Sequence, residues 1–357
     1  MNLPQSPEEY TSLSIFPNHT CNFQCKYCYS AQGRSRTVID RKRLQQTLDF
    51  FVNPDRLAPQ SLKLFISGGG EPLLTWDETR FAIVYANDRA LQYGFTIWTT
   101  IITNGSIVDE DMIETFKKYK CCVCFSFEVL EDVQNSLRGH YDKVHKTLMK
   151  YGQSGVHVSL NSTITPLCVS RMKEMAEKVL ADYPFVRNYT LEPVTDHTLF
   201  ETPEMMREFY RQFSNNYLEI KKAIDPDILS LWFSLDEMVD TVKMRYCPGK
   251  LCLTPHATFS VCHCTSSEAE ERYEKCVYGK VTDEGVVFDR EKFRKLMDIN
   301  ALNRERCRDC VAKRHCGGEC MTRWEQYPEA CMEEVCNFNR RWLQTQLEEK
   351  NGCSTEK

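Results

Sequence analysis

The chain has 357 residues and a formal net charge of −5, so nothing in its overall charge favours binding to nucleic acid. No apolar run reaches the ~18 residues of a membrane span, and the first ten residues lack the apolar core of a secretion signal. We therefore predict a cytoplasmic protein with no membrane or nucleic-acid partner. A chain this long needs no disulfides for stability, so its 19 cysteines predict metal ligands or catalysts.

The first two thirds of the chain alternate between strand-like and helix-like segments. The expected strands are 13–16, 62–66, 95–102, 121–127, 156–164 and 186–191, and the expected helices are 40–52, 76–93, 109–119, 141–151, 170–180 and 204–224. The connections are too long for hairpins, which predicts parallel strands with right-handed crossovers. The predicted fold class is therefore α/β, with a partial (β/α)6 parallel barrel over residues 1–225.

The pattern changes after Pro226. Residues 226–246 are expected to form a linker with a bridging helix over 235–244. Eleven of the 19 cysteines then lie between Cys247 and Cys336. We predict a separate cysteine-rich domain over 247–340, followed by a polar helix and tail over 341–357.

A loop with three cysteines follows the first expected strand. Cys21, Cys25 and Cys28 have C-x3-C-x2-C spacing, and three thiolates on a four-iron cluster leave one iron open. An open position at a metal centre is typical of a site for a reagent. The alternatives are a zinc ion with three cysteines and water, or unrelated thiols.

Two further loops are expected at the same mouth of the barrel, because loops that follow parallel strands gather at one face. The glycine run Ser67–Pro72 follows the second strand, and the turn around Asn104 follows the third. Glycines permit a close approach of the backbone to a ligand, and the Glu71 carboxylate suits a cationic amino group. Taken alone, the run is more typical of a tight strand-to-helix turn. The basic residues of 34–43 are interpreted as a solvated helix face.

These motifs resemble those of the radical S-adenosylmethionine superfamily. The cysteine loop has Tyr27 before its third cysteine, and Gly69-Gly70-Glu71-Pro72 is similar to that superfamily's glycine motif. The resemblance implies that Cys21, Cys25 and Cys28 hold a [4Fe–4S] cluster whose open iron chelates S-adenosylmethionine. Reductive cleavage of that molecule would release a 5′-deoxyadenosyl radical, which takes hydrogen from the substrate.

The same resemblance implies cofactor-binding residues. Gly69, Gly70 and Glu71 would hold the methionine amino group, and Asn104 and Ser126 would contact the ribose or carboxylate end. The Ser-x-Asp-Gly-like run of the family reads Ser126-Phe127-Glu128-Val129 here, which departs from the pattern. Arg138 also stands at a position similar to one in the family.

Spacing alone leaves the C-terminal cysteines open between zinc ribbons and iron–sulfur sites. Their pattern resembles the SPASM domain of peptide-modifying radical enzymes, with Ala257 where glycine is usual. That resemblance implies auxiliary cluster I on Cys247, Cys252, Cys262 and Cys320, with Cys264 as a competing ligand, and auxiliary cluster II on Cys307, Cys310, Cys316 and Cys336. His263 is a candidate proton acceptor beside the first of these, although a structural histidine is more common.

The leading hypothesis is an enzyme that abstracts hydrogen from a residue of a ribosomal peptide and forms a thioether or carbon–carbon crosslink. Its cofactors would be S-adenosylmethionine and three [4Fe–4S] clusters. Its partners would be a peptide or protein substrate and a reductant such as flavodoxin or ferredoxin. No peptide-binding wing is expected before Leu13, so the barrel, the cysteine-rich region or a separate protein would recognise a leader peptide. The alternatives are an anaerobic sulfatase-maturing enzyme that forms formylglycine, and a non-catalytic zinc or electron-transfer module.

Overall fold

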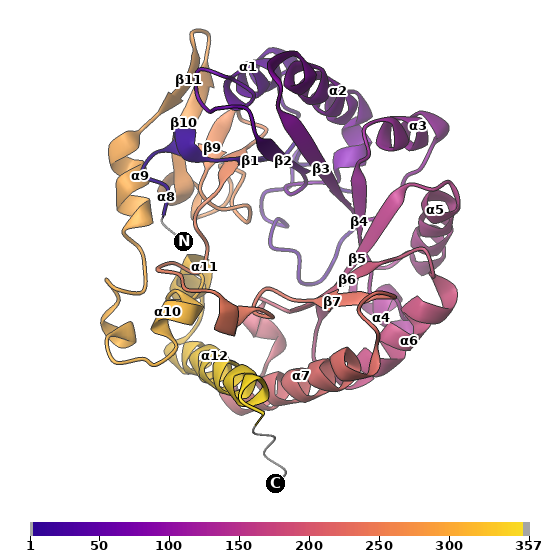
Figure 1. The fold of residues 1–357 in the computed structure, drawn as a ribbon, viewed down its shortest axis with the longest axis vertical. Helices are drawn as coiled ribbons and strands as arrows, with labels where there is room; N and C mark the ends of the chain where they lie inside the picture. The colour runs from indigo at the N-terminus through magenta and orange to yellow at the C-terminus, as the bar shows by residue number, and fades with distance from the viewer. Residues whose placement is uncertain (1–2, 353–357) are drawn as a thin grey trace.

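The computed structural model describes residues 3–352. Its centre is a curved sheet whose first seven strands are parallel and lie in chain order (Figure 1). These strands are β1 (Ser12–Ile15), β2 (Ser61–Ile66), β3 (Thr96–Thr103), β4 (Cys122–Ser126), β5 (His157–Ile164), β6 (Asn188–Pro193) and β7 (Ser230–Trp232). The predicted series of six parallel strands is confirmed, and β7 extends it.

Helices cover the outer face of this sheet (Figure 1). They are α1 (Arg41–Phe51), α2 (Trp76–Tyr93), α3 (Glu110–Lys118), α4 (Glu131–Leu137), α5 (Tyr141–Gln153), α6 (Met172–Asp182) and α7 (Pro203–Ala223). Several begin at an aspartate or threonine N-cap; the Asp109 carboxylate, for example, accepts the backbone N–H of Met112 at 2.8 Å. The helix ends agree with the sequence because capping is a local property.

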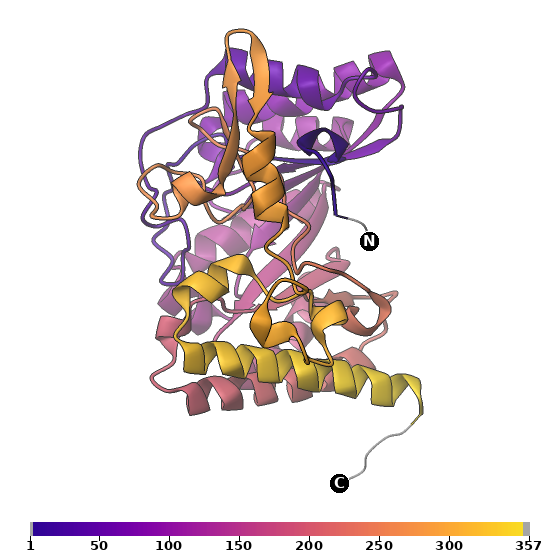
Figure 2. The ribbon, with the colours of Figure 1, turned by 90° about the vertical axis from the view of Figure 1, so that its left-hand side faces the viewer.

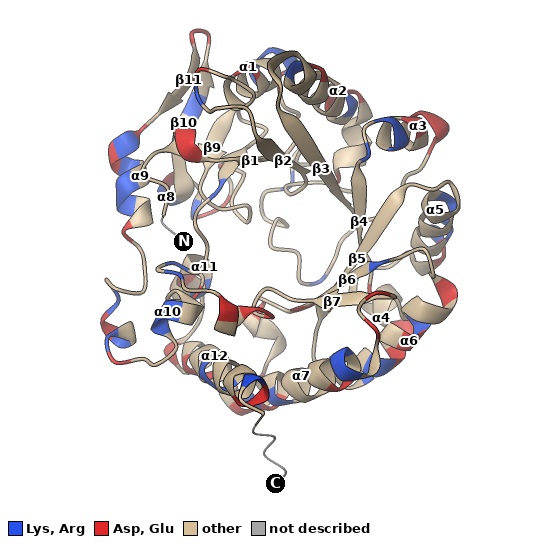
Figure 3. Ribbon diagram, in the orientation of Figure 1, with Lys and Arg blue, Asp and Glu red and all other residues tan. Residues whose placement is uncertain are grey.

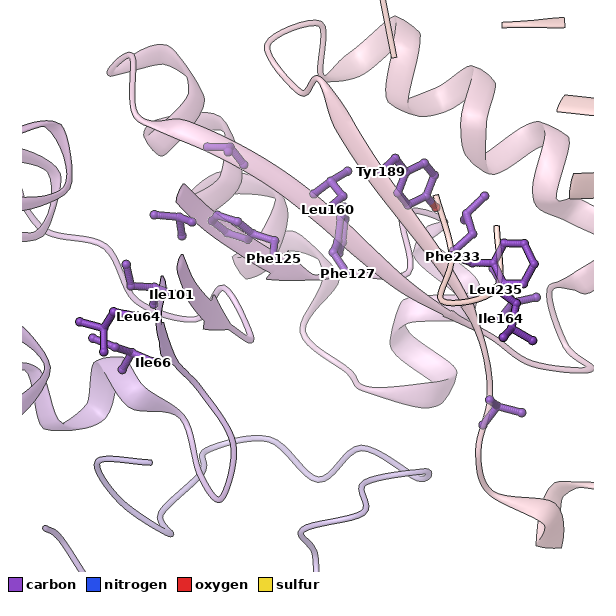
Figure 4. Close-up of a cluster of buried hydrophobic side chains, with 14 of the residues drawn as sticks. Leu64, Ile66, Ile101, Phe125, Phe127, Leu160, Ile164, Tyr189, Phe233 and Leu235 are labelled. Atoms are coloured by element: carbon purple, nitrogen blue, oxygen red, sulfur yellow. The ribbon is translucent and has the colours of Figure 1, made fainter. Parts of the chain in front are cut away.

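The core lies between the strands and these helices. Alternate side chains of each strand are fully buried, including Leu64, Ile66, Ile101, Phe125 and Leu160 (Figure 4). The side chains between them are only partly buried. Since the helices cover one face of the sheet, these alternating residues point into the barrel. The barrel interior is therefore the polar side of the sheet.

The cysteine-rich region continues the same sheet. β8 (Leu251–Leu253) pairs in parallel with β1, and β9 (Thr258–Ser260), β10 (Val277–Thr282) and β11 (Gly285–Phe288) follow as antiparallel strands. The sheet order is β11-β10-β9-β8-β1-β2-β3-β4-β5-β6-β7. The remaining helices are α8 (Tyr273–Cys276), α9 (Arg290–Met297), α10 (Lys313–Cys316), α11 (Met321–Gln326) and α12 (Glu329–Lys350).

The segment expected to bridge the two regions differs from the prediction. The helix predicted over 235–244 is wrong; residues 226–246 hold β7 and a 3-10 turn at Met238–Asp240. Side chains of α12 bond backbone groups of the segment 235–244 instead: the Trp342 indole donates to Leu235 O at 2.8 Å, and the Gln346 side chain accepts the Val239 N–H at 2.9 Å. The polar C-terminal helix begins at Glu329, earlier than expected, and lies along α7 (Figure 2). The predicted tail beyond residue 352 lies outside the described residues.

Positively and negatively charged residues are interspersed along the outer helices (Figure 3). None of the helices within residues 3–352 is long and apolar enough to cross a membrane.

Candidate active site

The cysteine loop lies between β1 and α1, inside the ring of strands in the view of Figure 1. Cys21, Cys25 and Cys28 are unpaired and partly buried. The Asn104 side-chain amide lies 3.6 Å from the Cys21 sulfur. Burial raises the pKa of Cys25, and Cys28 and Cys21 lie near enough to raise it further. The structure therefore brings the three predicted thiols together in one loop.

The glycine loop packs directly against the residues that lead into the cysteine loop. The backbone N–H of Gly70 donates to Asn18 O at 3.0 Å, and that of Glu71 donates to Thr20 O at 2.7 Å. A Cβ on Gly70 would lie 2.0 Å from Thr20 O. Gly69 has a φ of +60°, in the left-handed region. Glycine is required here because two backbones meet, which places the two motifs at one mouth as predicted.

The Glu71 carboxylate has hydrogen-bond partners that could not be predicted from the amino-acid sequence. It accepts hydrogen bonds from the Thr103 hydroxyl at 2.7 Å, from the Asn104 N–H at 2.6 Å and from the Leu73 N–H at 3.1 Å. The residue is 2% exposed, and burial raises its pKa. Glu71 thus ties the glycine loop to the turn after β3. Its predicted contact with a cofactor amino group remains a prediction.

Asn104 holds the third loop against the cysteine loop. Its Nδ2 donates to Asn22 Oδ1 at 2.8 Å, and its Oδ1 accepts the Ser106 N–H at 2.9 Å. Ser126 is the last residue of β4, on the face that points into the barrel. Asn104 and Ser126 therefore lie at the ends of β3 and β4, as expected, and their contacts with a cofactor remain predictions.

Arg34 is a site residue that the sequence interpretation missed. Its guanidinium donates to Gly69 O at 2.8 Å and to the Cys28 sulfur at 3.1 Å. The prediction of a solvated helix face is wrong for this residue, because α1 begins only at Arg41. Its position six residues after Cys28, inside the loop, was the available signal.

A buried network stands behind the cysteine loop. The Tyr27 hydroxyl donates to Glu128 Oε1, and Arg138 Nη1 donates to the Tyr27 hydroxyl at 3.1 Å. The Thr163 N–H donates to Glu128 Oε2 at 3.0 Å. Burial raises the pKa of Glu128 to about 7, although the nearby Arg138 opposes this. Arg138, similar in place to a family position, is therefore paired within the chain.

The first group of C-terminal cysteines lies around β8, the strand that pairs with β1. Cys252 lies fully buried on β8, and burial raises its pKa, as does the proximity of Cys262 and Cys247. The Cys264 thiol donates to Cys262, which lowers the pKa of Cys262 and raises that of Cys264. Cys320 lies near Cys264. The predicted four residues are brought together, with Cys264 among them.

The second C-terminal group lines one cavity. The Asn339 amide donates to the Cys316 sulfur at 3.3 Å. The Arg340 guanidinium donates to Cys310. The cavity is lined by Arg306, Cys307, Cys310, Ala312, Lys313, Cys316, Gly318, Glu319, Trp324, Cys336, Asn339 and Arg340. All four cysteines predicted for auxiliary cluster II therefore face the same space.

Nowhere in residues 3–352 do three or more His, Cys, Asp or Glu side chains converge closely enough to hold a single metal ion. A cluster of four irons and four sulfides is larger than one ion, so its thiolates stand further apart. The eighteen cysteines of this part of the chain are all unpaired.

Tyr29 and His263 stand between the two cysteine regions. Their rings meet edge to face with centroids 5.9 Å apart. The Tyr29 hydroxyl lies near Cys264, Cys28 and Cys262, which belong to both cysteine regions. Burial lowers the pKa of His263 to about 4, so the ring is neutral at pH 7 and is a weak proton acceptor. Its role as a catalytic proton acceptor remains a prediction.

Glu192 is a second residue that the sequence interpretation missed. It stands at the end of β6 on the face that points into the barrel, and it accepts hydrogen bonds from the hydroxyl and the N–H of Ser234. Burial raises its pKa to about 7, while Arg323 lowers it. A lone glutamate in a strand gives no sequence signal of this kind.

Comparison with known proteins identifies the class of the barrel. Residues 15–179 match the family model described as the radical SAM superfamily. Residues 15–179 are thus similar to a radical SAM domain, and that similarity implies S-adenosylmethionine and one [4Fe–4S] cluster. The residues present fit that group, because one loop supplies three thiols and because an amide and a guanidinium approach their sulfurs.

Two curated relatives extend the similarity. The serine-type anaerobic sulfatase-maturating enzyme of Klebsiella aerogenes is 23% identical over 216 residues, which are 60% of this chain and 53% of the relative. The radical SAM cyclopropyl synthase TigE of Paramaledivibacter caminithermalis is 20% identical over 358 residues, 90% of this chain and 70% of the relative. The chain thus spans about half the length of the sulfatase-maturating relative.

Solved structures share the fold. The anSMEcpe protein with bound AdoMet matches with a TM-score of 0.72 at 14% identity, over 95% of this chain and 98% of that one. Streptococcus suis SuiB bound to S-adenosylmethionine matches with a TM-score of 0.63 at 14% identity, over 90% of this chain and 77% of that one. The predicted α/β barrel with a cysteine-rich C-terminal region is confirmed.

Proposed function

We propose that this chain is a radical S-adenosylmethionine enzyme that modifies a residue of a ribosomally made peptide. The observation that carries the proposal is the joint packing of the cysteine loop, the glycine loop and the Asn104 turn at one mouth of the barrel. Cys21, Cys25 and Cys28 would hold the cluster, and Gly69, Gly70, Glu71, Asn104 and Ser126 would hold S-adenosylmethionine. When bound, these two groups supply a 5′-deoxyadenosyl radical.

The chain's own residues prepare the site. Arg34 donates to the Cys28 sulfur and Asn104 approaches that of Cys21, so both would stabilise thiolates. Glu71 fixes the two loops that flank the cofactor position. Tyr29 and His263 lie on the side of the C-terminal cysteines, where we place the substrate.

The C-terminal cysteines would hold two auxiliary clusters. Cys307, Cys310, Cys316 and Cys336 form the better defined set, because they line one cavity. Cys247, Cys262 and Cys320 would hold the other cluster with Cys252 as the fourth ligand, in competition with Cys264. The hydrogen bond between the Cys262 and Cys264 side chains supports Cys264 as the fourth ligand. The proximity of Cys252 to Cys247 and Cys262 supports Cys252 instead. These clusters would accept the electron that remains after the substrate radical closes.

A thioether or carbon–carbon crosslink is the reaction we place first. The similarity to a cyclopropyl synthase supports a reaction at carbon, and the fold match to SuiB bound to its precursor peptide SuiA supports a peptide substrate. Formylglycine formation is the second candidate. It is favoured by the sulfatase-maturating relative and by the fold match to anSMEcpe with bound peptide.

The first test is the metal content of anaerobically purified protein. We expect brown protein with about 12 iron atoms per chain, as follows from three four-iron clusters. Under reduction it should cleave S-adenosylmethionine to 5′-deoxyadenosine. In Cys25→Ala that cleavage should be lost, with iron lower by one cluster. Protein that binds only zinc would instead establish the non-catalytic alternative.

The second test concerns the substrate. Short peptides encoded beside this reading frame should be incubated with the reduced enzyme and examined by tandem mass spectrometry. Fragments that stay joined after cleavage indicate a crosslink, whereas an aldehyde that reacts with hydrazide indicates formylglycine. Omission of flavodoxin or of any separate leader-binding protein then measures the need for each partner.

A further inference from the structure

Tyr27 links the cysteine loop to the wall of the barrel. It stands between Cys25 and Cys28 in the sequence, and its hydroxyl meets both Glu128 and Arg138. The backbone N–H of Lys26 also donates to Leu137 O at 2.9 Å. The middle of the loop is thus attached at two neighbouring points to the segment around α4.

Glu128 is the centre of this attachment. Its side chain is fully buried and that of Arg138 is 9% exposed, with 3.8 Å between the two groups. One carboxylate oxygen accepts from Tyr27 and the other from the Thr163 N–H of β5. The Glu128 N–H donates to the Gln134 side chain at 3.0 Å. Both oxygens are therefore occupied by the chain, and no face of the carboxylate is open to a ligand.

Two roles for Glu128 can be compared. An ion pair that serves only the barrel wall would need no partner in the cysteine loop, yet the Tyr27 hydroxyl lies in direct contact with the carboxylate. A residue that contacts the cofactor would need an accessible oxygen, and Glu128 has none in this geometry. The contacts therefore favour a role that acts through Tyr27.

We propose that Glu128 is a positioning residue for the cysteine loop. It fixes Tyr27, and through Tyr27 the directions of the Cys25 and Cys28 thiols, instead of binding S-adenosylmethionine. This inference rests on the proposed function of the loop. It assigns a role at the position where the chain departs from the Ser-x-Asp-Gly-like run of the family.

Tyr27→Phe and Glu128→Ala test the proposal, with Glu128→Gln as the conservative variant. Each protein is reconstituted with iron and sulfide, and the reduced cluster is followed by EPR with and without S-adenosylmethionine. The change in the EPR signal on addition of S-adenosylmethionine reports on the cluster of Cys21, Cys25 and Cys28, since only that cluster is proposed to bind this cofactor. We expect an altered signal in both Tyr27→Phe and Glu128→Ala, and cleavage of S-adenosylmethionine slowed roughly tenfold to a hundredfold, as for other partners of metal ligands. Glu128→Gln should fall between these and wild type, because its amide oxygen still accepts from Tyr27.

Tyr189→Phe is the matched control. This buried tyrosine is also bonded within the barrel wall, with its hydroxyl 2.8 Å from that of Ser162, and its loss should leave the EPR signal unchanged. Circular dichroism of each variant reports on folding. An unchanged signal in Tyr27→Phe and Glu128→Ala would overturn the proposal. A normal signal without S-adenosylmethionine, combined with much weaker binding of it, would instead make Glu128 a cofactor ligand. Wild-type protein without iron or cleavage would refute the proposed function itself.

Discussion

Arg34 shows how one side chain joins two motifs that lie far apart in the sequence. It contacts the Cys28 sulfur and the Gly69 carbonyl, so it fixes the cysteine loop against the glycine loop. A cationic donor at a sulfur stabilises the reduced cluster more than the oxidised one, because the reduced cluster carries more negative charge.

We therefore expect Arg34→Met to lower the reduction potential of the first cluster. The change should be roughly tens of millivolts, where about 59 mV is tenfold in the one-electron equilibrium. Spectroelectrochemical titration measures it. Arg36→Met removes an exposed arginine of the same loop and should leave the potential at the wild-type value. Equal shifts in both variants would mean that net charge, and not the hydrogen bond, sets the potential.

Glu192 predicts a pH dependence of stability. Its pKa is raised from 4.5 to about 7, so the folded protein holds a proton that the unfolded chain has lost. This contribution is complete below about pH 4.5 and is lost as the pH rises through 7. Between pH 6 and 8 the free energy of unfolding of wild type should fall by roughly 1 kcal/mol relative to that of Glu192→Gln, whose side chain cannot ionise.

Urea unfolding of both proteins at the two pH values measures this difference. The exposed Glu201 supplies the control variant Glu201→Gln, whose stability relative to wild type should not change across the window. A constant difference between Glu192→Gln and wild type would show that Glu192 is ionised in the folded protein throughout.

At the scale of elements, the turn between β8 and β9 is held by Ala257 in a left-handed conformation. Its φ is +57°, which explains why glycine is usual at this position of the resembling domain. The N–H of Ala257 donates to Thr254 O at 3.0 Å, and its carbonyl accepts from Val281 at 2.8 Å, so the turn keeps its shape without glycine.

Ala257→Gly should therefore stabilise the protein. Replacing an alanine held in the left-handed conformation relieves roughly 1–2 kcal/mol of backbone strain. Roughly 0.5–1 kcal/mol of this gain is offset because glycine loses more conformational entropy on folding. Thermal unfolding should show a small rise in midpoint. Ala58→Gly, at an exposed alanine outside any helix or strand, lacks a positive φ and should lower the midpoint slightly. A lower midpoint in both variants would argue against strain at Ala257.

At the scale of the whole molecule, the two predicted regions share one sheet. β8 pairs with the edge of β1, and the Tyr10 hydroxyl donates to Pro248 O at 3.0 Å. α12 packs on α7, where Tyr210 and Phe338 stack with centroids 4.5 Å apart. The C-terminal region thus covers both an open strand edge and an apolar helix face of the barrel.

A chain truncated to residues 1–246 should consequently not fold as a stable unit. Loss of β8 and α12 exposes the β1 edge and the buried face of α7, which favours aggregation. We expect poor solubility, strong binding of an apolar dye and no cooperative unfolding transition. A truncated barrel that is soluble and unfolds cooperatively would show that the regions are independent domains.

The sequence by itself determined the features that depend on neighbouring residues. The hydrophobic period of each segment located the six parallel strands, and the spacings of Cys21 to Cys28 and of Cys307 to Cys316 selected thiols that the structure gathers. These inferences succeed because period, capping and close ligand spacing act over a few residues.

Only the tertiary structure decided which distant groups meet. The helix expected over 235–244 is absent because side chains of α12 bond backbone groups of that segment, and Glu71 finds its partners on the turn after β3. The contact of Tyr27 with Glu128 likewise joins residues 101 positions apart in the sequence. Such contacts depend on the closure of the barrel and on burial, which changes the hydrogen-bond partners and pKa of a polar group far more than its sequence neighbours do.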